Sequence, residues 1–239
     1  MSTAKKSVPP KEAEDSANAH SGSLPKGLAI LELLSSENAP MGVTALARHM
    51  DMPKSGVHRL LQVLRTLGWV RQSAAGEYEC TLKLWELGQR LANRVDLRGA
   101  AAAAMRELAA QTRETILLSI LDGTEVVYVD VIDSPQPVRA HTQAGDRAPA
   151  FCMATGKAML AYALPAVIDK IVENFEVFTP LTITTREQLE KELKRVRRKG
   201  FAFNRGEWGG GVRGIAAPIF DNHGEPVAAI SVGAPGERM

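Results

Sequence analysis

Cysteine is scarce in this chain. Only Cys80 and Cys152 occur among 239 residues; they lie far apart and form no CxxC pair. This scarcity argues against a zinc ribbon and a disulfide framework, and is typical of a reducing cytoplasm. Long apolar runs are also lacking, because no stretch is long enough to cross a bilayer and the N-terminus has no signal-peptide core. We therefore expect a cytoplasmic protein with no membrane partner.

An excess of charge of one sign is lacking as well. The 29 Lys and Arg residues are almost balanced by 27 Asp and Glu residues, which leaves a formal net charge of +2. A basic field over the whole molecule is thereby excluded, so any nucleic-acid site must be a local patch. The 45% hydrophobic and 23% charged content is normal for a soluble globular protein with one large domain or two small ones.

A local patch of this kind occurs between Met50 and Gly68. Pro53 suits the first turn of a helix, and Gly68 suits its C-terminal cap. Four apolar residues follow the spacing of one buried helical stripe: Val57, Leu60, Leu61 and Leu64. The opposite face carries no carboxylate and is rich in hydrogen-bond donors: Lys54, Ser55, His58, Arg59, Gln62 and Arg65. The pattern predicts a helix for a nucleic-acid groove; an ordinary surface helix with a basic face is the alternative.

The neighbouring segments favour the nucleic-acid interpretation. A second short helix is predicted over 42–50, and only Asp51 and Met52 join it to the basic helix, as in a helix-turn-helix. A further helix over 23–35 is expected to pack behind this pair. After Gly68, strands at 69–71 and 77–80 flank an Ala-Gly turn and predict a wing. Arg71 in this wing lies either near phosphate or simply in solvent.

The chain divides into four predicted parts. Residues 1–22 are polar and cannot bury a core, so we expect a disordered tail. Residues 23–82 form the winged helix-turn-helix, and 83–112 form a long, partly broken linker helix. The alanine run at 100–104 makes this linker either a dimer seam or a spacer. Residues 113–239 form a second domain.

The second domain is predicted to be an antiparallel sheet with helices packed on it, which gives an α+β fold overall. Hairpins are expected over 116–132, around Asp122 and Gly123, and over 215–232. Another strand is expected at 138–143 and a helix at 156–164. A later helix should begin with a capping box of Thr184 and Glu187 and end at Gly200.

Five segments carry a resemblance to a known family: KGLAILELL, PKSGVHRLLQVLRTLGWV, ETILLSILDGTEVVYVDVIDSPQPVR, ATGKAMLA and GVRGIAAPIFDNHGEPVAAISV. Together they resemble the IclR family of bacterial transcription regulators. The resemblance implies a winged helix, a linker helix and a GAF-like effector domain, in homodimers or homotetramers that bind operator DNA and answer small metabolites, often carboxylic acids. The expected DNA-binding residues are Lys54, Ser55, Gly56, His58, Arg59 and Arg71. Gly56 replaces a residue that usually bears a hydroxyl, which removes one DNA contact.

The resemblance also places an effector pocket beside the ATGK turn, at Ala154, Thr155, Asn204, Gly214, Ser231 and Gly233. The free N–H groups at the start of a helix here would suit a carboxylate. Phe151, just before the turn, is either an apolar wall of this pocket or plain core. Asn204 stands where an acidic residue is common and Gly214 where a cysteine is frequent. These two departures favour a carboxylate larger than a two- or three-carbon acid, for example an aromatic one.

One more departure and two other functions complete the expectations. The chain stops at Met239, where family members usually continue into a closing helix. An enzyme with a DNA-binding appendage is poorly supported, because 206–214 lacks the Lys-Ser/Thr of a phosphate loop and no Gly-x-Ser-x-Gly elbow occurs. Cys152 is a candidate nucleophile or, with His141, a redox or metal sensor, but zinc needs at least three protein ligands. No catalytic residue, metal or cofactor is expected.

Overall fold

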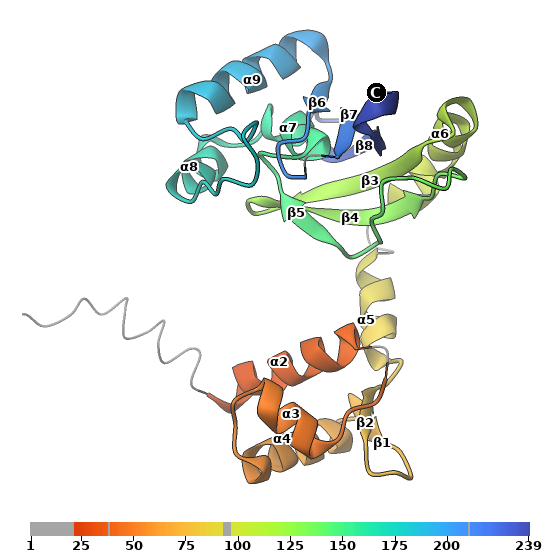
Figure 1. Cartoon of the computed structure of the whole chain (residues 1–239), viewed down its shortest axis with the longest axis vertical. Helices are drawn as coiled ribbons and strands as arrows, with labels where there is room; N and C mark the ends of the chain where they lie inside the picture. Colours follow the sequence, from red (N-terminus) through yellow and green to blue (C-terminus); the bar gives the residue numbers. More distant parts are fainter. Residues whose placement is uncertain (1–21, 38, 93–96, 210) are drawn as a thin grey trace, which may run out of the picture. The chain divides into compact units, whose positions relative to one another are not determined.

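The computed structural model describes residues 22–37, 39–92, 97–209 and 211–239 (Figure 1). The predicted tail therefore lies outside the described residues, except for Gly22. The chain forms two compact units, residues 1–95 and 96–239, and each is described by itself. Across the described ranges, none of the helices combines the length and the apolar character that a membrane span requires.

The first unit is a three-helix bundle followed by a hairpin and a further helix. Its elements are α2 (Ser23–Ser36), α3 (Val43–His49), α4 (Lys54–Thr66), β1 (Val70–Gln72), β2 (Tyr78–Cys80) and α5 (Lys83–Ala92). The predicted stripe of α4 is buried together with Ile30, Leu46 and Tyr78. Gly68 follows α4 with φ 76°, a left-handed conformation that favours glycine. The predicted helix-turn-helix with its wing is thus confirmed.

The second unit is built on a six-stranded antiparallel sheet with strand order β5-β4-β3-β8-β7-β6. The strands are β3 (Thr115–Asp122), β4 (Glu125–Ile132), β5 (Arg147–Pro149), β6 (Ala202–Asn204), β7 (Val212–Phe220) and β8 (Pro226–Pro235). The helices are α6 (Leu97–Thr112), α7 (Ala154–Leu160), α8 (Pro165–Glu173) and α9 (Arg186–Lys199). A turn of 3-10 helix, η1 (Gly236–Arg238), follows β8.

Side chains of the sheet alternate between two cores because successive strand residues point to opposite faces. Leu117 belongs to the core under α7, α8 and α9, whereas Ile116 and Leu118 pack against α6. Figure 1 shows α6 and the other three helices on separate sides of the sheet. The α+β architecture and both long hairpins predicted for this domain are confirmed.

Small residues lie next to one another where β7 pairs with β6 and β8. Gly214 pairs with Gly233 of β8 and with Asn204 of β6, and Ala216 pairs with Ser231. Because these side chains are small, they leave space above this part of the sheet, beside the first turn of α7. The sheet thus positions a hollow at the ATGK segment.

Several predicted boundaries are wrong. The strand expected at 138–143 has no ladder; the carbonyl of Ala140 instead accepts a hydrogen bond from Thr115 Oγ1 at 3.0 Å. The edge strand is β5, which is too short to show an alternating pattern. The helix expected at 156–164 starts at Ala154 and ends at Leu160, and α8 and β6 were not predicted.

The N-cap of α9 is Thr185, one residue later than predicted. Thr185 Oγ1 accepts from the Gln188 N–H at 3.2 Å, and Gln188 Oε1 accepts from the Thr184 N–H at 3.1 Å. The predicted pair of Thr184 and Glu187 is therefore wrong, because the sequence offers two adjacent threonines and two adjacent acceptors. The linker is described as α5 and α6, and residues 93–96 between them lie outside the described part.

Candidate functional site

The outward face of α4 presents hydrogen-bond donors, some of which have no partner. Lys54, Ser55, His58 and Arg59 are exposed, and no acidic residue occupies the first turn of the helix. Within the described ranges, neither Lys54 nor Arg59 has a hydrogen-bond or ion-pair partner. Gly56 is half-buried: a Cβ there would come 3.4 Å from Met52 Cε, so even a small side chain would touch the preceding turn.

Other donors on this side are already engaged. His58 Nε2 lies 3.3 Å from Gln62 Nε2, which in turn donates to Tyr78 Oη at 3.2 Å. In the wing, Arg71 Nε donates to Glu79 Oε1 at 2.8 Å, although the Arg71 side chain remains 71% exposed. A phosphate would have to compete with Glu79 for Arg71, whereas Lys54 and Arg59 are ready for an anion.

A cavity of about 150 Å³ opens in the second unit above the small residues of β7 and β8. Six of the seven residues predicted for an effector line it: Ala154, Thr155, Asn204, Gly214, Ser231 and Gly233. Phe151 does not. It is 5% exposed and packs edge-on against Phe175, with ring centroids 5.1 Å apart. Phe151 therefore belongs to the core, and its interpretation as a wall of this cavity is corrected.

The polar groups of the cavity are mostly donors. Thr155 is 2% exposed, and its Oγ1 has no hydrogen-bond partner in the described part of the chain. Asn204 Oδ1 accepts from the Gly206 N–H at 2.8 Å and from the Glu207 N–H at 3.2 Å. Because both partners are donors, the amide orientation is fixed and its NH₂ group is left for other acceptors. The residues that line the cavity include no Asp or Glu.

Sequence reasoning missed five polar or aromatic residues of the lining: Tyr128, His141, Thr142, Trp208 and Arg213. Tyr128 is 3% exposed, and burial, helped by the charge of Asp146, raises the pKa of its phenol, which therefore stays protonated. Arg213 is exposed and supplies a cation to the lining. No local signal pointed to Arg213, because adjacent residues of a strand such as β7 point to opposite faces of the sheet.

The space in the cavity depends on glycine. A Cβ on Gly214 would lie 3.3 Å from the Val232 carbonyl oxygen and 3.8 Å from Ala154 Cβ. A side chain at 214 would thus project between the opposing walls. A Cβ on Gly233 would meet Leu117 Cδ1 at 3.6 Å.

Comparison with known proteins explains both sites together. The family model described as the bacterial transcriptional regulator IclR C-terminal domain matches residues 89–239. The model described as the IclR helix-turn-helix domain matches residues 23–74. The chain belongs to the IclR family of bacterial transcriptional regulators. It is therefore a DNA-binding protein through its first unit and carries the family's C-terminal domain in its second.

Curated relatives support the IclR assignment over nearly the whole chain. The HTH-type transcriptional regulator KdgR of Escherichia coli K12 is 39% identical over 217 residues, which are 90% of this chain and 82% of the relative. The transcriptional repressor IclR of the same organism is 29% identical over 241 residues, 99% of this chain and 88% of the relative. These relatives are regulators and not enzymes.

Solved IclR structures have the same architecture. The crystal structure of the Thermotoga maritima IclR superposes with a TM-score of 0.74 at 28% identity, covering 90% of this chain and 88% of that one. An IclR homolog from Microbacterium hydrocarbonoxydans, complexed with 4-hydroxybenzoate, gives a TM-score of 0.80 at 24% identity, covering 90% of each chain. At that identity the second likeness shows the fold alone.

The cysteine-based alternatives are not supported by the geometry of this IclR-family protein. Cys152 is fully buried, and its pKa is raised to about 12 by burial, helped by the charge of Glu207. A thiol that stays protonated is a poor nucleophile and a poor metal ligand. In the ranges that the structure describes, no three His, Cys, Asp or Glu residues gather closely enough to hold a metal ion.

Proposed function

We propose that this regulator binds operator DNA through α4 and the wing, in the cytoplasm, and that a small carboxylate in the cavity of the second unit controls this binding. The observation that carries the proposal is the lining of the cavity, where a buried hydroxyl without a partner faces no competing carboxylate. A buried polar group without a partner costs about 1–3 kcal/mol. A ligand that accepts a hydrogen bond from Thr155 removes this cost and is favoured accordingly.

The lining also describes the ligand. Arg213 supplies a positive charge, and the Asn204 amide and the Ser231 hydroxyl supply further hydrogen bonds. Leu117, Met153 and Val232 give the same cavity apolar walls, which suit a carbon skeleton. We infer a carboxylate larger than a three-carbon acid. The bound aromatic acid of the Microbacterium homolog makes 4-hydroxybenzoate a sensible probe, beside a hydroxylated acid such as gluconate.

We expect a thermal-shift screen with acetate, lactate, 4-hydroxybenzoate and gluconate to raise the melting temperature only with the larger acids, because a ligand that binds the folded state stabilises it.

Replacement Thr155→Val should change the melting temperature of the free protein and its affinity for the acid in opposite directions. Without ligand, the melting temperature should rise, since a buried unpaired hydroxyl is removed. The affinity for the stabilising acid should fall about tenfold, the equivalent of one hydrogen bond.

The matched control is Ser119→Ala. Ser119 Oγ is also buried without a partner in the described part, but it does not line the cavity. This variant should raise the melting temperature without changing ligand affinity, measured by calorimetry. Stabilisation by acetate and lactate alone, or an unchanged affinity in Thr155→Val, would contradict the proposed ligand and its site.

We further propose that the regulator acts as a homodimer joined through its first unit. A groove of about 760 Å³ runs along α2, α4 and α5. Most of its lining is apolar, and Glu32 and Arg59 also contribute to it, so a dimer contact here must leave the Arg59 guanidinium at the edge of the interface to reach DNA. Leu24, Leu28, Val63 and Leu67 in this groove are 52% to 72% exposed. Such a patch on a small domain is typical of an interface. A twofold contact between two copies would also match the paired half-sites that dimeric helix-turn-helix proteins bind.

Replacement Leu28→Glu should therefore abolish the dimer, because it places a charge in the centre of the apolar contact. Light scattering coupled to size-exclusion chromatography measures the mass directly. Leu181→Glu is the control, because Leu181 is 60% exposed in the second unit and lies outside the groove. A dimer that survives Leu28→Glu would exclude this groove as the interface.

A further inference from the structure

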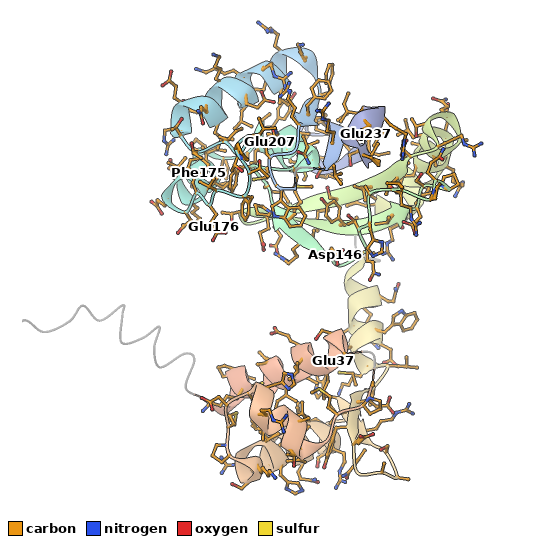
Figure 2. All side chains as sticks on the ribbon, viewed as in Figure 1. Glu37, Asp146, Phe175, Glu176, Glu207 and Glu237 are labelled. Carbon is orange, nitrogen blue, oxygen red and sulfur yellow. The ribbon has the colours of Figure 1, made fainter. Side chains whose placement is uncertain are left out.

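A buried ion pair lies next to the cavity and is not used by the mechanism above. Lys157 of α7 is 0% exposed, and its Nζ donates to Oε1 of Glu207, whose side chain is 5% exposed. Glu207 belongs to the segment between β6 and β7 (Figure 2). The pair therefore joins the helix that carries Ala154 and Thr155 to the segment that carries Asn204 and Trp208.

Glu207 is engaged through every polar group it has. Its Oε2 accepts from the Arg205 N–H, and its own N–H donates to Asn204 Oδ1 at 3.2 Å. Its carbonyl accepts from Thr182 Oγ1 at 2.6 Å and from Thr179 Oγ1 at 3.3 Å. One residue thus fixes the turn that follows β6 and ties it to two distant parts of the domain.

We propose that Lys157 and Glu207 form a positioning pair, which holds the 204–209 wall of the cavity against the start of α7. The proposal rests on the proposed function in taking this cavity as the effector site. Both residues act through others: Lys157 holds Glu207, and Glu207 sets the direction of the Asn204 amide and the place of Trp208. Neither Lys157 nor Glu207 lines the cavity itself.

The competing explanation is that the ion pair only fills space in the core. The energetics of buried ion pairs distinguish this structural role from the positioning role. Replacing a buried ion pair by apolar residues of similar volume is often neutral or stabilising, whereas removing one partner strands a buried charge. If the pair only fills space, the double replacement Lys157→Met and Glu207→Met should preserve its function. If the pair positions the turn that follows β6, the double replacement should not, because methionine cannot anchor that turn through side-chain hydrogen bonds.

The test measures the 204–209 wall without any effector, so its outcome is independent of whether a carboxylate binds. In the unmodified full chain, amide hydrogen exchange compares two turns whose N–H groups donate to side chains. Gly206 and Glu207 donate to Asn204, and His223 and Glu225 donate to Asp221 at 2.8 and 2.9 Å. We expect exchange at 206 and 207 to be slower by about tenfold or more, because that turn is buried and anchored by the pair, whereas residues 221–225 are exposed.

The double variant then isolates the pair. We expect its melting temperature to stay near that of the parent, its protection at 206 and 207 to fall to the level of the 221–225 turn, and acrylamide quenching of Trp208 to rise about twofold. Trp69→Phe and Trp85→Phe in parent and variant leave Trp208 as the single tryptophan of the chain. Asp169→Asn with Arg186→Gln, which removes an exposed ion pair, is the control and should leave Trp208 unchanged.

Two results would overturn the positioning role. One is a double variant with native stability and unchanged exchange and quenching, which would show packing alone. The other is equal exchange of the two turns in the unmodified chain, a result that does not depend on whether the double variant folds.

Discussion

Replacement Gly156→Ala is expected to prevent folding of the second unit. Gly156 is buried in α7, where a Cβ would lie 2.0 Å from the Ala150 carbonyl oxygen and 2.5 Å from the Ala150 Cα. The obstacle is backbone and not the end of a flexible side chain, so a rotamer change cannot relieve it. The cost should exceed the about 1–3 kcal/mol of ordinary overpacking and approach the whole stability of a domain.

Gly88→Ala is the matched control, because Gly88 is also a helical glycine but has no atom within 4 Å of its Cβ position. This substitution should stabilise α5 by about 0.5–1 kcal/mol, since alanine is the better helix former. Thermal unfolding followed by circular dichroism measures both changes, with opposite signs. A Gly156→Ala protein that melts like the parent would mean that α7 does not approach Ala150 so closely.

The sequence was most informative where local patterns and tertiary structure agree. Three such patterns were predicted correctly, because each is compatible with only one local structure. They are the apolar stripe of α4, the glycine that follows α4, and the Asp122-Gly123 turn. The edge strands β5 and β6 have only three residues, which is too short for a periodic signal. The apparent strand at 138–143 failed because its residues join no ladder; Ala140, His141 and Thr142 line the cavity instead.

The candidate cavity shows the same division. Ala154, Asn204 and Gly214 were placed there through the resemblance, since motifs carry positions from one family member to another. Tyr128 and Trp208 come from segments about 80 residues apart, and only the folded sheet and the Glu207 turn bring them to one hollow. No local pattern encodes that meeting. Phe151 was misplaced because a phenylalanine beside a pocket motif looks the same in sequence whether it faces the cavity or the core.

The double replacement Lys54→Ala and Arg59→Ala should have the largest effect on DNA binding. These two side chains are exposed, positively charged and without partners in the part of the chain described, so they can meet an anion without breaking another interaction. Each base contact of this type contributes about 1–3 kcal/mol, and each phosphate contact contributes about 0.9 to the slope of log affinity against log salt. We expect a loss of at least tenfold in affinity and a shallower salt dependence.

The measurement is a titration of a duplex selected from a random library with the unmodified chain, repeated at several salt concentrations. Arg71→Ala should have a smaller effect, because the ion pair of Arg71 with Glu79 must be broken before the wing can hold phosphate. Arg106→Ala, on the exposed face of α6, removes a similar charge from the other unit and should leave affinity unchanged. If the double variant binds as tightly as Arg106→Ala at every salt concentration, α4 does not enter a groove of the DNA. Another surface of the first unit must then make the contact.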